Sequence, residues 1–429
     1  VTCSDCHDPH TAKLVTGPDP NAVCAQCHSP AVFAAESHMG HVPDAAGCVD
    51  CHMPARTYMV VDDRRDHSFR VPRPDIAEET GSPLSCANCH ADQSPAWAKA
   101  AIAKYAGDAR DPGFAAALAA ASVGHANPAL VDVVSNSAFP GIARAAAIEA
   151  LAPPFSEQDI ETLVRALADP DPLVRVGALA SLRGFAPAEK ARFAGPLLTD
   201  PVKSVRIDAA LAFADTVDLL DAGGRRAFDE AAAEFRRSRL LTASQTDSLL
   251  SLAAFEARLG KREAARAAFE RALYIEPGWS VIRTNFADFL REEGEDDRGE
   301  EILREGLELN PDDAILHHTL GLLLVRTGRS SDALESLEAA ARLDVDNARF
   351  SYVLGVALNS LGRSDDAAST LASAYEKYPG NFEVAWAYAT ITRDRGELAV
   401  AREIVATMRT RFPGNPDVEA LVRQLSAEP

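Results

Sequence analysis

The sequence predicts a mainly α-helical chain in which an irregular, loop-rich segment precedes a long solenoid of helical repeats. All eight cysteines fall in the first 89 residues, a region with frequent proline and glycine and no sustained helical period. From about residue 94 the composition shifts to Ala, Leu, Arg and Glu, with apolar residues at helical spacing. Two internal periods then follow, first of 31 and later of 34 residues.

The composition indicates a globular chain of more than one domain. It has 429 residues, of which 47% are apolar, and its formal charge is −20. A negative balance spread over the whole chain argues against a nucleic acid as partner, because binding a phosphate backbone requires a basic surface. The sequence contains no run of 18 consecutive apolar residues, so it predicts no transmembrane helix. We expect four parts: 1–93, 94–126 (a helical linker), 127–221 and 222–429.

The cysteines form four C-x-x-C pairs, and a histidine follows each pair at once. The motifs read CSDCH (Cys3, Cys6, His7), CAQCH (Cys24, Cys27, His28), CVDCH (Cys48, Cys51, His52) and CANCH (Cys86, Cys89, His90). With this spacing two thiols reach the vinyl groups of one porphyrin while the histidine reaches its iron. A pair of zinc ribbons or a disulfide framework would use similar cysteines without requiring the histidines. We therefore predict four covalently attached haem c groups.

The remaining histidines of this region are candidates for the second axial ligands. They are His10, His38, His41 and His67, as many as the predicted haems. His10 follows its own proximal histidine too closely to reach the opposite face of the same haem, so we expect it to reach a neighbouring one. Either His38 or His41 could ligate an adjacent iron, and we expect His67 to reach the third haem. Met39, Met53 and Met59 are weaker candidates, as is His125.

Arginines cluster after the third motif in a chain that is otherwise acidic. Arg64, Arg65 and Arg70 are predicted partners of haem propionates, because a guanidinium binds a carboxylate through two hydrogen bonds. The alternative is a solvated surface on which they pair with neighbouring aspartates. Because residues 1–93 lack a helical period, we expect the porphyrins to form most of the core and the haem-free segment not to fold.

The 31-residue period aligns three columns of residues. These are Arg144, Arg175 and Arg206; Ala147, Ala178 and Ala209; and Leu151, Leu182 and Phe213. The segments DPDPLVRVGALASL and DPVKSVRIDAALAFA place a proline at a helix start and small or apolar residues on its inner face. This pattern resembles HEAT repeats.

The 34-residue period begins near residue 246. Glycines recur at Gly260, Gly294, Gly328, Gly362 and Gly396, and small residues recur where two helices of a hairpin approach each other. This is the tetratricopeptide (TPR) pattern, repeated five times. We expect each glycine to end a first helix in a left-handed conformation, and residues 222–245 to form a capping helix. Such solenoids are protein-interaction modules. His317 and His318 point about 100° apart on their helix, which disfavours a shared metal site.

The order of these motifs resembles the bacterial multihaem c-type cytochromes that are fused to tetratricopeptide repeats. In addition, GCVDCHMP, the later DH pair and CANCH resemble the last haem motifs of cytochrome c nitrite reductase and its octahaem relatives. The second resemblance implies that His67 is a distal ligand. Both imply that the chain is the C-terminal part of a longer cytochrome with further haem motifs upstream.

Three functional hypotheses follow from these predictions. The first is electron transfer through bis-histidine haems, with the solenoid binding a redox partner or another protein. The second is a role as subunit of a multihaem oxidoreductase that acts on nitrite, hydroxylamine or a similar nitrogen compound. A third, weaker hypothesis is a redox sensor in which the haems control protein binding. Because bacteria attach haem c outside the cytoplasm, we expect a periplasmic or other extracytoplasmic location.

Overall fold

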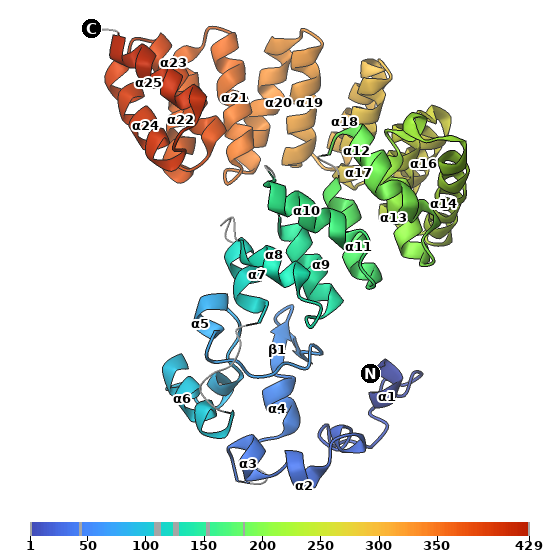
Figure 1. The fold of residues 1–429 in the computed structure, drawn as a ribbon. Coiled ribbons are helices and arrows are strands. Elements are labelled where there is room, and N and C mark those ends of the chain that lie inside the picture. Colours follow the sequence, from blue (N-terminus) through green and yellow to red (C-terminus); the bar gives the residue numbers. More distant parts are fainter. Residues whose placement is uncertain are drawn as a thin grey trace. The chain divides into compact units, whose positions relative to one another are not determined.

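The computed structural model describes residues 2–42, 45–106, 113–122, 128–151, 155–182 and 185–427. The chain divides into two compact units, Val1–Ala231 and Ala232–Pro429 (Figure 1). The division falls inside one long helix, α14 (Ala222–Leu241). His125 and part of the expected linker lie outside the described residues.

The segment that carries the cysteine motifs consists of short helical turns and one hairpin. Its elements are α1 (Cys3–Cys6), η1 (Cys24–Gln26), α2 (Pro30–Phe33), α3 (Glu36–Met39), α4 (Cys48–His52), β1 (Ala55–Tyr58), β2 (Asp62–Arg65), α5 (Ala77–Thr80) and η2 (Ser85–Asn88). The two strands pair antiparallel, with Tyr58 opposite Asp62. Among the described residues from 2 to 93, the buried hydrophobic side chains are those of Val49 and Ala77. This segment therefore has almost no side-chain core of its own.

Helices take over from residue 95, as the composition predicts. The first unit continues with α6 (Pro95–Ala106), α7 (Ala115–Ser122), α8 (Ala129–Ser135), α9 (Gly141–Ala150), α10 (Glu157–Ala166), α11 (Pro172–Ser181), α12 (Pro187–Ala194), η4 (Gly195–Thr199), α13 (Lys203–Phe213) and η5 (Val217–Leu219). The helices α9, α11 and α13 pack in succession. Ala147, Ala178 and Ala209 are each fully buried on them, so the small-residue column lies where neighbouring helices meet.

The arginine column of the 31-residue period forms a ladder of polar contacts. Arg144 pairs with Asp169, and 31 residues later Arg175 donates to Oδ1 of Asp200 at 2.9 Å. Arg175 and Arg206 also donate to the main-chain carbonyls of Asp169 and Asp200, at 2.6 and 2.7 Å. A buried ion pair is tolerated when further hydrogen bonds satisfy its charges. The ladder therefore joins consecutive helical pairs through matched side chains.

The second unit is a regular stack of two-helix hairpins. After α14 come α15 (Thr246–Arg258), α16 (Arg262–Ile275), α17 (Ser280–Glu292), α18 (Asp296–Leu309), α19 (Ala314–Arg326), α20 (Ser330–Leu343), α21 (Ala348–Ser360), α22 (Ser364–Lys377), α23 (Phe382–Asp394), α24 (Leu398–Arg411) and α25 (Pro416–Ala427). The five period glycines have φ between +67° and +82°, which confirms the left-handed helix ends. None of the described helices has both the length and the apolar character needed to cross a bilayer.

Candidate haem-binding site

Each of the four motifs folds as a short helical turn that places two thiols and a histidine together. We name them site 1 (Cys3, Cys6, His7), site 2 (Cys24, Cys27, His28), site 3 (Cys48, Cys51, His52) and site 4 (Cys86, Cys89, His90). All eight thiols are free. The described residues contain no group of three or more His, Cys, Asp or Glu side chains that could hold a metal ion.

Polar side chains link the sites in their sequence order. Gln26 of site 2 donates to the carbonyl of Asp5 in site 1 at 3.2 Å. The Asn21 side chain, just before site 2, accepts from the amide of Val49 in site 3 at 3.3 Å. Ser85, just before site 4, donates to the carbonyl of Cys51 in site 3 at 3.1 Å. Neighbouring sites are thus in direct contact along the chain.

Three of the motif histidines face a histidine from outside the motifs. The ring centroids are 6.2 Å apart for His7 and His67, 6.2 Å for His52 and His38, and 6.1 Å for His90 and His41. The angles between the ring planes are 36°, 11° and 32°. Two imidazoles on opposite sides of one metal have centroids about 6 Å apart, because each metal–nitrogen bond is about 2 Å long. The three pairs therefore fit an iron held between two histidines.

Hydrogen bonds orient four of these six imidazoles. At site 1, Nδ1 of His7 lies 2.8 Å from the carbonyl oxygen of Ala12, and Nδ1 of His67 lies 2.9 Å from that of Arg65. At site 3, Nδ1 of His52 lies 2.6 Å from the carbonyl oxygen of Arg70. At site 4, Nδ1 of His41 lies 2.8 Å from the carbonyl oxygen of Met39. A carbonyl only accepts, so Nδ1 carries the proton in each ring. In the neutral form of such a ring, Nε2 has the free lone pair that a metal ligand requires.

Site 2 differs from the other three. His28 packs edge-on against Phe33 with a centroid distance of 5.0 Å, and Phe33 packs edge-on against His38 at 5.3 Å. The fourth candidate ligand, His10, is exposed in the turn after site 1. Within the described part of the chain, no imidazole faces either His28 or His10. The sequence predicted that His10 reaches a neighbouring haem, and this stays a prediction.

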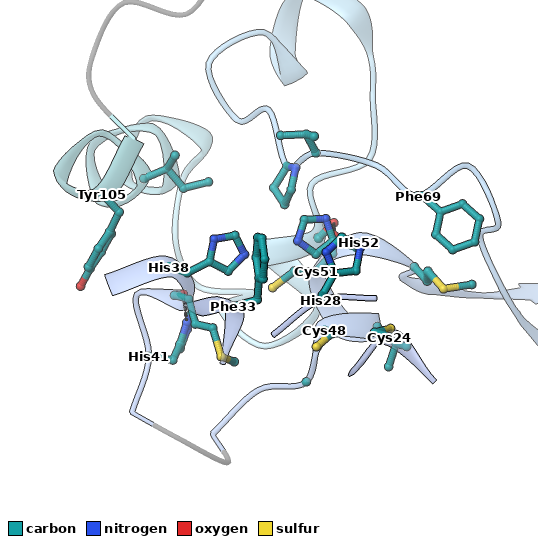
Figure 2. A pocket seen from close by; sticks show the side chains of 18 of the residues that line it. Cys24, His28, Phe33, His38, His41, Cys48, Cys51, His52, Phe69 and Tyr105 are labelled. Carbon is teal, nitrogen blue, oxygen red and sulfur yellow. Dashed lines mark hydrogen bonds between the residues drawn. The ribbon is translucent and has the colours of Figure 1, made fainter. Parts of the chain in front are cut away.

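A cavity of about 490 Å³ lies among sites 2, 3 and 4 (Figure 2). His28, His38, His41 and His52 all line it. Burial raises the pKa of the Cys51 thiol, and the nearby Cys86 raises it further. The volume and the mixture of aromatic, thiol and imidazole groups suit a bulky, flat cofactor.

Two aromatic side chains of α6 extend this site, and the sequence analysis did not identify them. The Trp97 ring lies 4.8 Å from the ring of His90. The Tyr105 ring packs against Gly40, close enough that a Cβ there would lie 2.9 Å from it. Gly40, with φ +67°, lies between His38 and His41. Neither aromatic belongs to a motif, so the sequence offered no signal for them beyond their position after site 4.

The three predicted propionate arginines make ion pairs with nearby aspartates. Arg64 pairs with Asp62 at 2.7 Å, Arg65 with Asp50 at 3.5 Å, and Arg70 with Asp66 at 2.7 Å. These contacts match the alternative of a solvated surface, and a propionate role stays a prediction. Of the methionines, Met39 and Met53 line the cavity, whereas Met59 is 75% exposed at the hairpin tip.

Comparisons with protein families match the first 33 residues and three stretches of the second unit. Tetratricopeptide-repeat models match residues 246–278, 318–382 and 358–425. A model described as a doubled CXXCH motif matches residues 1–33, where sites 1 and 2 lie. The chain therefore contains tetratricopeptide repeats and a haem-attachment motif of the c type. The resemblance to cytochrome c nitrite reductase stays a prediction.

Several solved structures resemble part of the chain. PilW, described as a type IV pilus biogenesis factor, is 15% identical, with 52% of this chain and 100% of that chain covered and a TM-score of 0.38. YrrB, described as a TPR protein with an unusual peptide-binding site, is 16% identical, covers 45% of this chain and 98% of its own, and has a TM-score of 0.35. MamA is 17% identical, with coverages of 39% and 91% and a TM-score of 0.34. A search of curated proteins found no match.

Proposed function

We propose that the chain is an extracytoplasmic tetrahaem c-type cytochrome that transfers electrons through bis-histidine sites and binds a protein partner through its helical repeats. The observation that carries this proposal is the set of three histidine pairs with centroids 6.1–6.2 Å apart. A haem with two histidine ligands has no open coordination position, so it supplies one-electron transfer rather than substrate chemistry.

These pairs support our proposal of a distal ligand for three sites. His67 serves site 1, His38 serves site 3 and His41 serves site 4. The sequence favoured His67 for the third haem, so this assignment differs from that prediction. His38 and His41 belong to α3 and the turn after it, and one short segment thereby orients the ligands of two neighbouring sites.

The order of the sites supports a continuous path for electrons. The contacts of Gln26, Asn21 and Ser85 join site 1 to site 2, site 2 to site 3 and site 3 to site 4. A second connection joins site 1 to site 3 through residues 67–70. His67 belongs to the site 1 pair, and three residues later the carbonyl of Arg70 accepts a hydrogen bond from His52 of site 3. The protein keeps these ligands at fixed positions with short polar contacts rather than with a packed core.

The tetratricopeptide repeats supply the binding function. Their hairpins stack through buried small residues, and such solenoids present extended surfaces to other proteins. We propose a redox partner, or a protein that localises the cytochrome, as the ligand of this surface.

A second candidate function concerns site 2. Because His28 packs against Phe33 rather than facing a second imidazole, an exogenous small ligand could bind there. This observation favours the alternative of an oxidoreductase subunit acting on nitrite or hydroxylamine.

Electron paramagnetic resonance of the oxidised, haem-loaded protein tests both proposals. Low-spin signals are expected from sites 1, 3 and 4, and His38→Ala, His41→Ala and His67→Ala should each convert one of them to high-spin. His317→Ala, in the repeats, is the matched control and should change no signal. If the three variants leave the low-spin signals intact, the ligand assignment is wrong.

The state of site 2 separates the two functions. A high-spin signal that shifts with nitrite or hydroxylamine favours the oxidoreductase. A fourth low-spin signal that is lost in His10→Ala favours electron transfer alone, with His10 as a ligand.

A further inference from the structure

The number of hydrogen bonds to the axial histidines differs between the sites. At site 1 both rings donate through Nδ1, His7 to Ala12 at 2.8 Å and His67 to Arg65 at 2.9 Å. At site 3 only His52 donates to a carbonyl, and at site 4 only His41 does so.

Aromatic contacts replace the second carbonyl at sites 3 and 4. His38 of the site 3 pair packs edge-on against Phe33 at 5.3 Å. His90 of the site 4 pair packs against Trp97 at 4.8 Å. Within the described residues, neither imidazole has a hydrogen-bond acceptor. These rings therefore lack the polarising contact that both rings of site 1 make.

A carbonyl that accepts from Nδ1–H increases the basicity of the imidazole toward its metal. A more basic ligand stabilises the oxidised iron, and second-shell hydrogen bonds are one of the terms that set haem potentials. We propose that site 1 has the lowest reduction potential of sites 1, 3 and 4, with Asp8 as the residue that positions its proximal histidine. The inference rests on the proposed bis-histidine ligation. An electron that enters at site 1 from a one-electron donor protein would then move toward sites 3 and 4 with falling free energy.

The acceptor for His7 is built by a tight turn of residues 8–13. Oδ1 of Asp8 accepts from the amide of Thr11 at 2.9 Å, from its hydroxyl at 2.9 Å and from the amide of His10 at 3.1 Å. The turn closes through main-chain bonds from Ala12 to Asp8 and from Asp8 to Lys13, each 2.8 Å long. Ala12 has φ +56°, a left-handed conformation that is unfavourable for alanine. The Asp8 side chain therefore helps to hold the Ala12 carbonyl in a conformation that the local sequence disfavours.

Redox titration of the haem-loaded protein, followed by electron paramagnetic resonance, tests this order. His67→Met identifies the site 1 signal, because replacing histidine by methionine changes that signal alone and raises its potential. In the unsubstituted protein, site 1 should have the lowest midpoint of sites 1, 3 and 4. Asp8→Ala should raise its reduction equilibrium constant by about tenfold, which corresponds to about 59 mV for one electron.

Asp8→Asn is the matched control, because it removes the charge and keeps the oxygen that accepts from Thr11 and His10. It should move the site 1 midpoint much less than Asp8→Ala. Equal shifts in the two variants would assign the effect to charge and overturn the positioning role. If Asp8→Ala does not accumulate with haem, Thr11→Val removes one of the three contacts and should give a smaller shift in the same direction.

A lowest midpoint at site 3 or site 4 would overturn the order itself. That result leaves the low-spin signals in place, so it is distinguishable from failure of the proposed bis-histidine ligation, in which those signals would be missing.

Discussion

His318 is a half-buried residue on α19, and it packs against Phe350 with ring centroids 4.5 Å apart. Burial, with a smaller contribution from the charge of Arg349, lowers the pKa of His318 to about 4. Protonation at this position is therefore unfavourable in the folded repeats, whereas the unfolded chain binds the proton near the ordinary pKa of histidine.

The stability of the repeats should depend on pH through His318. Above about pH 6.5 the ring is neutral in both states and contributes no pH dependence. As the pH falls from there to about 4, the unfolded state binds the proton first and the folded state loses about 1–2 kcal/mol, allowing for partial solvent exposure. In His318→Phe, the thermal unfolding midpoint, followed by circular dichroism, should vary less with pH between about 6.5 and 4 than in the unsubstituted protein. Thr319→Ala on the same helix is the control, and an unchanged pH profile in His318→Phe would contradict the assignment.

At the level of the helices, close packing inside each hairpin depends on small residues. At Gly355 on α21, a Cβ atom would lie 2.6 Å from Cγ of Leu371 on the partner helix α22. Leu371 is fully buried, so it has no free space into which it could move. The glycine therefore permits the approach of the two helices.

Gly355→Ala should destabilise the repeats by about 1–3 kcal/mol, the usual effect of overpacking a filled core. The midpoint of urea unfolding measures this effect. Gly278→Ala is a matched control in the same unit, because nothing lies within 4 Å of the added atom, and it should change stability by less than about 0.5 kcal/mol. Equal midpoints for the two variants would show that the hairpin repacks freely.

The periodic elements could be predicted from the sequence because periodicity reports packing directly. The left-handed glycines and the buried alanine column lie where the two periods place them. The hairpin of β1 and β2 could not be predicted, because its turn lacks the usual glycine and asparagine. Met59 and Val60 instead occupy the left-handed region, with φ of +48° and +72°. The histidine pairing was also out of reach, since it depends on single contacts, such as that of His52 with the Arg70 carbonyl, that follow no period.

At the level of the whole molecule, the motif segment (residues 1–93) and the helical repeats are stabilised in different ways. The repeats bury many apolar side chains, whereas the described residues from 2 to 93 bury only two hydrophobic ones. The helical units therefore carry their own hydrophobic driving force, and the segment with the motifs needs another source of stability.

Protein produced without haem should retain its helical repeats and lose the structure of residues 1–93. Limited proteolysis with mass spectrometry should show cleavage within that segment in the haem-free protein and protection in the haem-loaded protein. Circular dichroism should report nearly the same helical content in both, because the long helices begin at residue 95. Protection of the motif segment without haem would contradict the idea that the cofactor forms its core.

The histidine pairs have a consequence for the topology of the chain. Through an iron, His7 would be joined to His67, His38 to His52 and His41 to His90. Each such cross-link closes a loop of the chain. The largest loop, from His7 to His67, encloses the second and third motifs. By analogy with disulfides, a cross-link over 15 to 100 residues removes about 3–5 kcal/mol of unfolded-chain entropy. The loops from His7 and His41 also overlap, so the segment would resemble a cross-linked network in which ligand exchange at one iron loosens the others.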